Sequence, residues 1–256
     1  MARVFISGST DGLGLAAART LLSKGHKVLL HARSQDRAAA VRDLESDALG
    51  IVVGDLGNAA DTESVAQQVN AIGRMDAVIH NAATYMQRTR GPTPEGHAIT
   101  LAVNTLAPYI LTALIARPQR LVYLSSGLHR SGSASLRDVD WIERRWDAGE
   151  AYAESKLFVT ALAFAVARLW PDVASHAVDP GWVPTKMGGS NATDDLEQGH
   201  LTQTWLAGSD NPEADISGYW RHRTRQSPAP EATDPKFQER LLAKLAELTG
   251  MALPKG

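Results

Sequence analysis

Short apolar segments alternate with longer helical ones along most of the chain, and this alternation limits the possible folds more than any other feature. Strands separated by helices pair in parallel, because each helical crossover returns the chain to the same end of the sheet. We therefore predict a single α/β domain over residues 1–256, with a doubly wound parallel sheet of about seven strands flanked by helices. The expected strands are residues 2–7, 26–31, 51–54, 75–80, 119–126, 173–178 and 218–220.

The segments between these strands supply the expected helices and two irregular regions. Residues 127–150, with three glycines and two tryptophans, indicate an insertion on the surface beside the site. Residues 186–214 contain a glycine-rich and acidic stretch that indicates a substrate lid. Helices are expected after the first strand up to Gly25 and over residues 35–46, 58–72, 97–117, 154–169 and 235–248.

Composition narrows the classes of ligand. The chain has 26 Lys and Arg against 28 Asp and Glu, so no overall field would attract nucleic acid or an anionic membrane, and a small molecule is the expected partner. The absence of cysteine excludes disulfides and thiolate nucleophiles, and the eight histidines show no metal-ligand spacing, so no metal is expected. The start is not typical of a signal peptide and no apolar run is long enough to span a bilayer. A cytoplasmic protein is therefore expected.

A glycine-rich loop, Gly8-Ser9-Thr10-Asp11-Gly12-Leu13-Gly14, follows the first expected strand. Glycines allow a tight turn and a close approach of a pyrophosphate, and the first N–H groups of the following helix face its phosphates. The spacing G-x3-G-x-G differs from the G-x-G-x-x-G dinucleotide fingerprint, and any turn between a strand and a helix favours glycine. The loop is a candidate phosphate site, and an ordinary turn is the alternative.

Polar residues follow other strands at the edge where parallel sheets bind their ligands. Asp55 comes just after the third strand, Asn81 just after the fourth, and the loop of residues 179–185 follows the sixth. These positions suit contacts with a bound nucleotide. Asp55 and Asn81 would equally suit roles as turn or cap residues.

Tyr152 and Lys156 lie at the start of a long apolar run. Four residues apart, they share one face of a helix, so the lysine ammonium can sit beside the tyrosine phenol. A nearby cation favours the phenolate and is expected to lower the pKa of Tyr152 toward the working range of a general acid or base. A chance pair is the alternative.

Two serines and one asparagine are further candidates for the chemistry. Ser125 and Ser126 end the fifth strand, and since neighbours on a strand point to opposite faces, only one of them can face Tyr152 and donate to a substrate carbonyl. Asn104 lies four residues before Pro108, which has no N–H to donate to the Asn104 carbonyl. That carbonyl would suit a water molecule in a proton relay. The alternative is a simple kink with Asn104 as a buried polar residue.

The end of the second strand indicates the cofactor. In dinucleotide folds that use NAD, an acidic residue there accepts hydrogen bonds from the ribose 2′-hydroxyl, whereas an arginine accommodates a 2′-phosphate. Here Arg33 and Ser34 follow the strand and no acid is present, which favours NADP(H) over NAD(H), with Ser34 and His31 as weaker contacts. The alternative is that Arg33 is only a solvated loop charge, since no second basic residue lies in Ser9-Thr10-Asp11.

The helices of residues 97–117 and 154–169 are apolar on almost every face, so each needs cover beyond the sheet. A second subunit is the simplest cover, and a homodimer or homotetramer is therefore expected. The insertion of residues 127–150 is the alternative cover.

In their joint order and spacing, these motifs resemble the short-chain dehydrogenase/reductase family. The resemblance covers essentially the whole chain and implies a Rossmann-type domain that binds a nicotinamide dinucleotide. The motifs that carry it are Gly8-x3-Gly12-x-Gly14, Asp55-Leu56, Asn81-Ala82, Asn104, Ser126, Tyr152-x3-Lys156 and Pro180-Gly181.

The resemblance also implies roles for these residues. Tyr152 would be the acid or base, and Lys156 would lower its pKa and hold the nicotinamide ribose. Ser126 would orient the substrate oxygen, and Asn104 would anchor the relay water. The residues implied to contact the cofactor are Gly8, Ser9, Thr10, Asp11, Gly12, Leu13, Gly14, Arg33, Ser34, Asp55, Leu56, Asn81, Ala82, Tyr152, Lys156, Pro180, Gly181, Val183 and Thr185.

Some positions depart from the family pattern. Ser7 replaces the usual threonine, residues 80–83 read His-Asn-Ala-Ala, and the interval between Ser126 and Tyr152 is unusually long. That interval and the closing helix resemble the retinol-dehydrogenase-like branch and its bacterial relatives, which implies an apolar or aromatic carbonyl compound or alcohol as substrate. The alternatives are a dinucleotide-binding sensor without catalysis, and an epimerase or dehydratase on the same fold. The sensor would commonly lack the tyrosine or the lysine.

Overall fold

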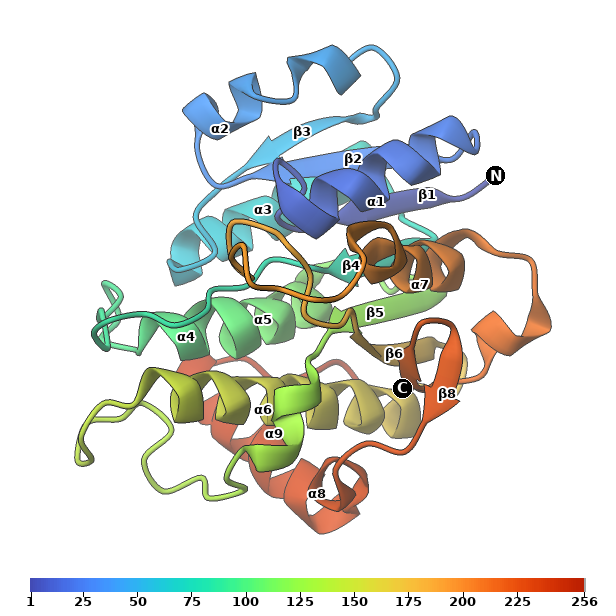
Figure 1. The fold of residues 1–256 in the computed structure, drawn as a ribbon. Coiled ribbons are helices and arrows are strands. Elements are labelled where there is room, and N and C mark those ends of the chain that lie inside the picture. Colours follow the sequence, from blue (N-terminus) through green and yellow to red (C-terminus); the bar gives the residue numbers. More distant parts are fainter. Residues whose placement is uncertain (256) are drawn as a thin grey trace.

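The computed structural model describes residues 1–255, which form an eight-stranded sheet between two layers of helices (Figure 1). The strand order is β3-β2-β1-β4-β5-β6-β7-β8, and all neighbours pair in parallel except β7 and β8. The order reverses between β1 and β4, and doubly wound sheets bind their ligands at such a point. The predicted fold class is confirmed. The strands are β1 (Arg3–Ile6), β2 (Lys27–Ala32), β3 (Gly50–Val53), β4 (Ala77–His80), β5 (Arg120–Leu124), β6 (Ala174–Asp179), β7 (Gly218–Arg221) and β8 (Thr224–Gln226).

Helices connect the strands and cover both faces of the sheet (Figure 1). The α-helices are α1 (Gly12–Ser23), α2 (Gln35–Ala39), α3 (Ala59–Ile72), α4 (Ile99–Leu101), α5 (Ala107–Leu114), α6 (Ala148–Leu169), α7 (Leu196–Gly208), α8 (Pro230–Thr233) and α9 (Pro235–Thr249). Short 3-10 turns span Arg42–Leu44, Gly127–Ser131 and Pro212–Asp215, and a π-helical turn spans Ala102–Leu106. None of the helices within residues 1–255 combines the length and apolarity needed to cross a bilayer.

Successive side chains of each strand pack against different helix layers, because they point to opposite faces of the sheet. On β1, Phe5 belongs to the core shared with α3, α5, α6 and α9, whereas Val4 and Ile6 belong to the core shared with α1 and α7. Both faces are apolar, as a parallel sheet covered on both sides requires. The loops that follow the parallel strands therefore meet at one edge.

The sequence patterns do not predict β8, α7 or α8. β8 has three residues, all exposed, so it lacks the apolar alternation that indicates a strand. α7 lies within residues 186–214, the expected lid, yet it packs on α1 and β5. Its buried side includes the polar residues Thr202, Gln203 and Thr204, so the sequence does not show the apolar periodicity of a packed helix. Only the part of that segment before Leu196 stays a candidate lid.

The predicted helix of residues 97–117 is wrong in its bounds and regularity. α4 begins at Ile99, the π-helical turn follows it, and α5 ends at Leu114. Pro108 stands in the first turn of α5, where a missing N–H costs least, and the widened turn lies directly before it. The predicted helix of residues 35–46 is also shorter, since α2 ends at Ala39.

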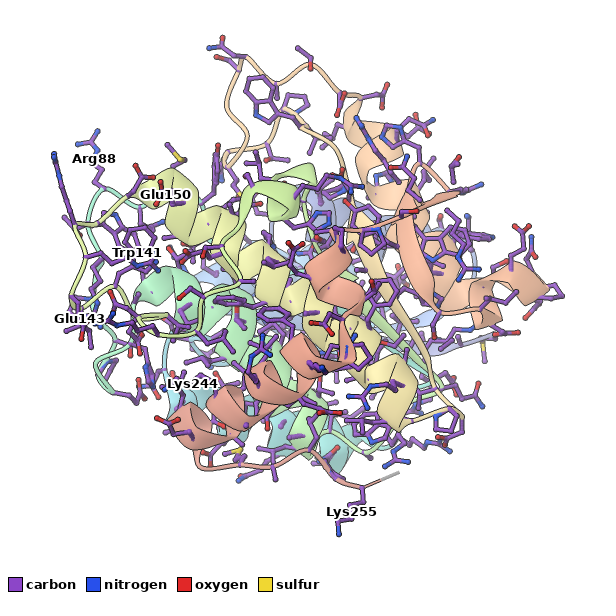
Figure 2. All side chains as sticks on the ribbon, turned by 90° about the horizontal axis from the view of Figure 1, so that it is seen from below. Arg88, Trp141, Glu143, Glu150, Lys244 and Lys255 are labelled. Carbon is purple, nitrogen blue, oxygen red and sulfur yellow. The ribbon has the colours of Figure 1, made fainter. Side chains whose placement is uncertain are left out.

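α6 is covered by its own chain on the sides away from the sheet. It contacts α8 and α9, and Figure 2 shows α9 lying across it. From the insertion, Arg144 donates to the buried Glu154 carboxylate of α6 at 2.8 and 2.7 Å, and Trp141 Nε1 donates to it at 3.0 Å. α6 thus needs no second subunit to cover it, while the homodimer or homotetramer expected from the two apolar helices stays a prediction.

Candidate active site

The start of α6 carries the pair Tyr152 and Lys156. Asp147 caps the helix by accepting from the Glu150 N–H at 2.9 Å, so the helix begins before the pair and places both residues on one face. Both side chains are buried, and Lys156 Nζ lies 5.5 Å from the centre of the Tyr152 ring. Lys156 Nζ also donates to the Leu124 carbonyl, at the end of β5, at 2.7 Å. The fold therefore brings the pair to the ligand edge of the sheet.

The pKa of Tyr152 is raised, not lowered as the sequence predicts. Burial raises it because the phenolate would lose its contact with water, and the neighbouring Ser126 hydroxyl opposes the rise. Burial lowers the pKa of Lys156 to about 7, and its amine donates to a carbonyl rather than to the phenol. Tyr152 is therefore protonated at neutral pH, in the form that can donate a proton.

The two serines after β5 point in different directions. Ser125 is buried, and its hydroxyl lies 2.6 Å from the Thr160 hydroxyl of α6. Ser126 is half-buried beside Tyr152, and its hydroxyl accepts from the Leu128 N–H at 3.2 Å, which caps the 3-10 turn Gly127–Ser131. Of the two hydroxyls, only that of Ser126 lies beside the Tyr152 phenol.

Asn104 lies in the π-helical turn and is buried. Its side-chain oxygen accepts from the Thr84 N–H at 2.7 Å, and its amide nitrogen donates to the Thr84 carbonyl and to the Ser155 hydroxyl, both at 3.0 Å. The Asn104 side chain therefore connects the loop after β4 to α6. The Asn104 side chain is thus a buried polar group whose hydrogen bonds are satisfied, as in the alternative above. The relay role of the Asn104 backbone carbonyl stays a proposal.

Close contacts in the glycine loop leave no room for a side chain at Gly8 or Gly14. A Cβ on Gly14 would lie 2.3 Å from the Gly8 carbonyl oxygen, so only glycine lets α1 start so close to β1. Asp11 caps α1 by accepting from the Gly12 N–H at 2.8 Å. Asn81 donates to the Gly8 carbonyl at 3.1 Å. Asn81 thus supports the loop, and the first N–H groups of α1 face the ligand edge.

Other predicted contact residues also support the loops of this edge. His31 is buried, its Nδ1 accepts from the Gly8 N–H at 2.9 Å, and its Nε2 donates to the Gly54 carbonyl at 3.0 Å. Burial lowers the pKa of His31 to about 4, so it is neutral and unavailable as a phosphate contact, contrary to the prediction. Asp55 accepts from the Gly57 N–H at 2.9 Å within its own turn. Ala82 packs against Gly8 and Leu56 is buried.

Two arginines, not one, lie at the end of β2. Arg33 and Ser34 are exposed, and Ser34 caps α2 by accepting from the Arg37 N–H at 3.3 Å. Arg37 reaches the glycine loop, with Nη2 at 3.3 Å from both the Thr10 hydroxyl and the Asp11 carboxylate. Sequence reasoning missed Arg37, although Ser34 is a typical N-cap that places the third helical residue on the loop side.

The loop after β6 closes on the glycine loop. Val183 is buried and Pro180 and Gly181 are half-buried, while the Thr185 methyl lies beside Gly12. Lys186 Nζ pairs with the Asp11 carboxylate at 2.6 Å, and this contact lowers the pKa of Asp11.

Tyr152 has an aromatic neighbour, and three of the loops at this edge carry exposed apolar side chains. The Tyr85 ring meets the Tyr152 ring edge-on, with centroids 4.5 Å apart. The loops after β4, β5 and β6 each contribute exposed apolar residues, namely Met86, Leu128, Trp182 and Met187. Sequence reasoning missed Tyr85 and Met86, which stand in an otherwise polar loop. The two insertion tryptophans pack on each other, Trp141 also lies against the Arg144 guanidinium, and Trp146 Nε1 donates to the Gln87 carbonyl at 2.9 Å.

These residues fit a nicotinamide dinucleotide: a glycine loop with no space for a Cβ at Gly8 or Gly14, a helix N-terminus and two arginines lie near the switch point, and a buried tyrosine and lysine lie at the same edge. Among residues 1–255, no three or more His, Asp or Glu side chains group in a way that could hold a metal ion. Fold and site define a dinucleotide-dependent oxidoreductase. The chain belongs to the short-chain dehydrogenase/reductase family, whose members bind NAD(P): a family model described as "Enoyl-(Acyl carrier protein) reductase" matches residues 8–214.

Individual relatives cover the whole chain. It is 41% identical to the short-chain dehydrogenase chyC of Penicillium rubens, over 99% of this chain and 100% of that one. It is 28% identical to human retinol dehydrogenase 13, over 98% of this chain and 85% of that one. A crystal structure of an uncharacterised protein from Mycobacterium paratuberculosis superposes with a TM-score of 0.84 at 25% identity, covering 99% of this chain and 95% of that one. The predicted family is confirmed, and the predicted resemblance to retinol dehydrogenases is found as a similarity at 28% identity.

Proposed function

We propose that this enzyme uses NADP(H) to transfer a hydride between nicotinamide and the carbonyl or alcohol carbon of an apolar or aromatic small molecule. The observation that carries the proposal is the convergence of Ser126, Tyr152 and Lys156 at the carboxyl edge of β5. Tyr152 donates its phenolic proton to the substrate oxygen, and its raised pKa keeps that proton available at neutral pH. The cofactor supplies the hydride when bound.

The neighbouring residues position this proton. The Ser126 hydroxyl lies beside the phenol and donates to the same substrate oxygen. Lys156 donates to the Leu124 carbonyl, and its Nζ lies 5.5 Å from the centre of the Tyr152 ring. Its proposed role is to hold the nicotinamide ribose. Asn104 fixes the loop after β4 against Ser155, and its carbonyl is the proposed anchor of a relay water.

NADP(H) is proposed over NAD(H) because no acid directly follows β2, where Arg33 stands, and a second guanidinium, that of Arg37 on α2, lies nearby. Arg37 already reaches Thr10 and Asp11 of the glycine loop, and Arg33 is exposed next to it. A guanidinium fork suits a 2′-phosphate, with Ser34 as a further donor. Asp11 opposes this preference in part, yet its charge is already paired by Arg37 and Lys186.

An apolar substrate is supported by the rim of Met86, Leu128, Trp182 and Met187 and by the edge-on Tyr85 ring. These exposed apolar side chains come from the loops after β4, β5 and β6, which end at the same edge of the sheet, and apolar residues at such an edge favour an apolar ligand. We further propose that residues 186–195 form the lid over the cofactor, joined to the glycine loop by the Lys186–Asp11 pair.

The test is the decay of NADPH absorbance with apolar and aromatic ketones and aldehydes, compared with polar sugar-like carbonyl compounds as controls. We expect turnover with the apolar group at several times the kcat/KM of the polar group. Tight NADPH binding without turnover of any carbonyl compound would contradict the proposal and favour a dinucleotide-binding protein without catalysis.

A further inference from the structure

The turn that carries Ser126 is fixed by a buried histidine, His129. Both of its ring nitrogens have partners: Nδ1 lies 2.7 Å from the Ser126 carbonyl oxygen, and Nε2 accepts from the Ala229 N–H at 2.9 Å. Because Nε2 accepts a hydrogen bond, the ring proton is on Nδ1 and is donated to the Ser126 carbonyl. Burial lowers the pKa of His129, which keeps this neutral tautomer in place.

The same turn is packed between the catalytic helix and the C-terminal segment. On the α6 side, a Cβ on Gly132 would lie 2.5 Å from the Ala153 carbonyl oxygen, so the chain passes directly against the residue after Tyr152. On the other side, the His129 ring lies 4.8 Å from the Tyr219 ring of β7, centroid to centroid. Arg130 also donates to the Ser227 carbonyl, at 2.6 Å.

We propose that His129 is a positioning residue for the reaction, and that its ring N–H sets the direction of the Ser126 hydroxyl. The Ser126 carbonyl accepts two hydrogen bonds from His129, one from the ring and one from the backbone N–H at 3.1 Å. Two donors from different directions fix the peptide plane, and the plane fixes where the serine side chain points. The C-terminal segment, through Ala229, thereby holds the serine against Tyr152. This inference rests on the proposed role of Ser126.

Two substitutions of similar shape separate the two hydrogen bonds. His129→Asn keeps an N–H near the place of Nδ1 and loses the acceptor for Ala229, whereas His129→Gln keeps an acceptor near the place of Nε2 and loses the donor to Ser126. We expect kcat for NADPH-dependent carbonyl reduction to fall about tenfold or more in His129→Gln and to stay within about threefold in His129→Asn. KM for NADPH should be unchanged in both, while thermal stability falls in both.

The matched control is Arg130→Ala, which removes another link between the turn and the C-terminal segment but touches neither bond to Ser126. Its kcat should equal that of the wild type. If His129→Gln does not fold, as judged by NADPH binding, His129→Leu fills the same buried space and should show the same loss of kcat.

The outcomes separate the positioning role of His129 from the proposed role of Ser126. Two results would overturn the positioning role of His129 alone, provided that Ser126→Ala is inactive. One is wild-type kcat in folded His129→Gln or His129→Leu. The other is an equal loss of kcat in the Asn and Gln variants. Wild-type kcat in Ser126→Ala would instead overturn the proposed role of the serine.

Discussion

The start of α6 and the loop of residues 182–195 face the same ligand edge but are held in very different ways. Tyr152 and Lys156 are buried, and Glu154 between them is bonded to Arg144 and Trp141 of the insertion. The loop is largely exposed, and its link to the glycine loop is a Lys186–Asp11 pair whose side chains are 79% and 42% exposed. Buried contacts fix geometry, whereas exposed ion pairs contribute little and break readily.

We propose that this difference matches two tasks of the site, proton transfer at α6 and admission of the dinucleotide at the loop. Proton transfer needs atoms held within a fraction of an ångström, which the packed helix provides. Admission of a dinucleotide needs a segment that can open, and the loop keeps its own shape while doing so, since Trp182 is bonded to both Asp194 and Gly188. We therefore expect substitutions on the packed side to change kcat, and substitutions on the exposed side to change cofactor affinity or exchange.

Among the residues beside Tyr152, Ser126 is expected to have the largest effect on kcat when replaced by alanine. Removing a donor from the substrate oxygen should lower kcat by about a hundredfold, the cost of losing one oxyanion donor elsewhere. Ser125→Ala is the matched control on the same strand end, because its hydroxyl faces Thr160 inside the core, and its kcat should stay within about threefold. Steady-state kinetics with a saturating carbonyl substrate gives both numbers. The opposite order would show that the register is wrong by one residue.

Next come the two arginines, which should change cofactor choice and not kcat. Arg33→Ala and Arg37→Ala should each lower kcat/KM for NADPH by about ten- to a hundredfold and leave that for NADH unchanged, because only the 2′-phosphate loses a charged donor. Arg42→Ala, an exposed arginine on the turn after α2, is the control. Equal use of the two cofactors by the wild type would remove the basis for NADP(H).

Lys156 should affect stability as a function of pH. Its pKa is about 7 in the folded protein against 10.5 ordinarily, so between these values the unfolded chain binds the extra proton and stability rises with pH. The rise contributed by Lys156 should approach about 1.4 kcal/mol per pH unit from about pH 7.5 to about 9.5. Urea unfolding of the wild type and Lys156→Met at several pH values measures it. Parallel curves for the two proteins would mean that Lys156 is not buried as an amine of lowered pKa.

The smallest effect is expected for Lys186→Ala. Loss of an exposed pair with Asp11 should speed NADPH release by roughly one- to fivefold, the range that such pairs are worth, with kcat unchanged unless release limits turnover. Stopped-flow NADPH fluorescence measures the release rate. Lys244→Ala, which breaks a comparable pair with Glu247 on α9, should leave it unchanged. A large fall in kcat for the chemical step would place Lys186 on the catalytic side of the comparison.

Much of the fold could be predicted from the sequence because it depends on local periodicity. The apolar strands and the glycine loop gave the parallel sheet, and the strand ends gave the edge where Asn81, Ser126 and Tyr152 gather. β8 and α7 could not be predicted in this way, since β8 is exposed and α7 buries polar residues against its neighbours. Their form depends on tertiary contacts.

The candidate site was only partly predictable for the same reason. The spacing of Tyr152 and Lys156 places them together, but the direction of the phenol pKa depends on burial, which no spacing reveals. Arg37 contacts Thr10, which lies more than twenty positions before it in the sequence, and His129 contacts Ala229, which lies a hundred positions after it. Such contacts become visible only when the chain is folded.

The proposed role of Tyr152 as the proton donor is tested by kcat for Tyr152→Phe, measured beside the Kd of NADPH. The substitution keeps the ring, its packing against Tyr85 and its place on α6, and it removes the phenolic hydroxyl together with the proton proposed to reach the substrate oxygen. We expect NADPH to bind as in the wild type and kcat to fall by about a hundredfold or more, within the range that positioned general acids contribute. A variant that binds NADPH normally and keeps wild-type kcat would contradict the account.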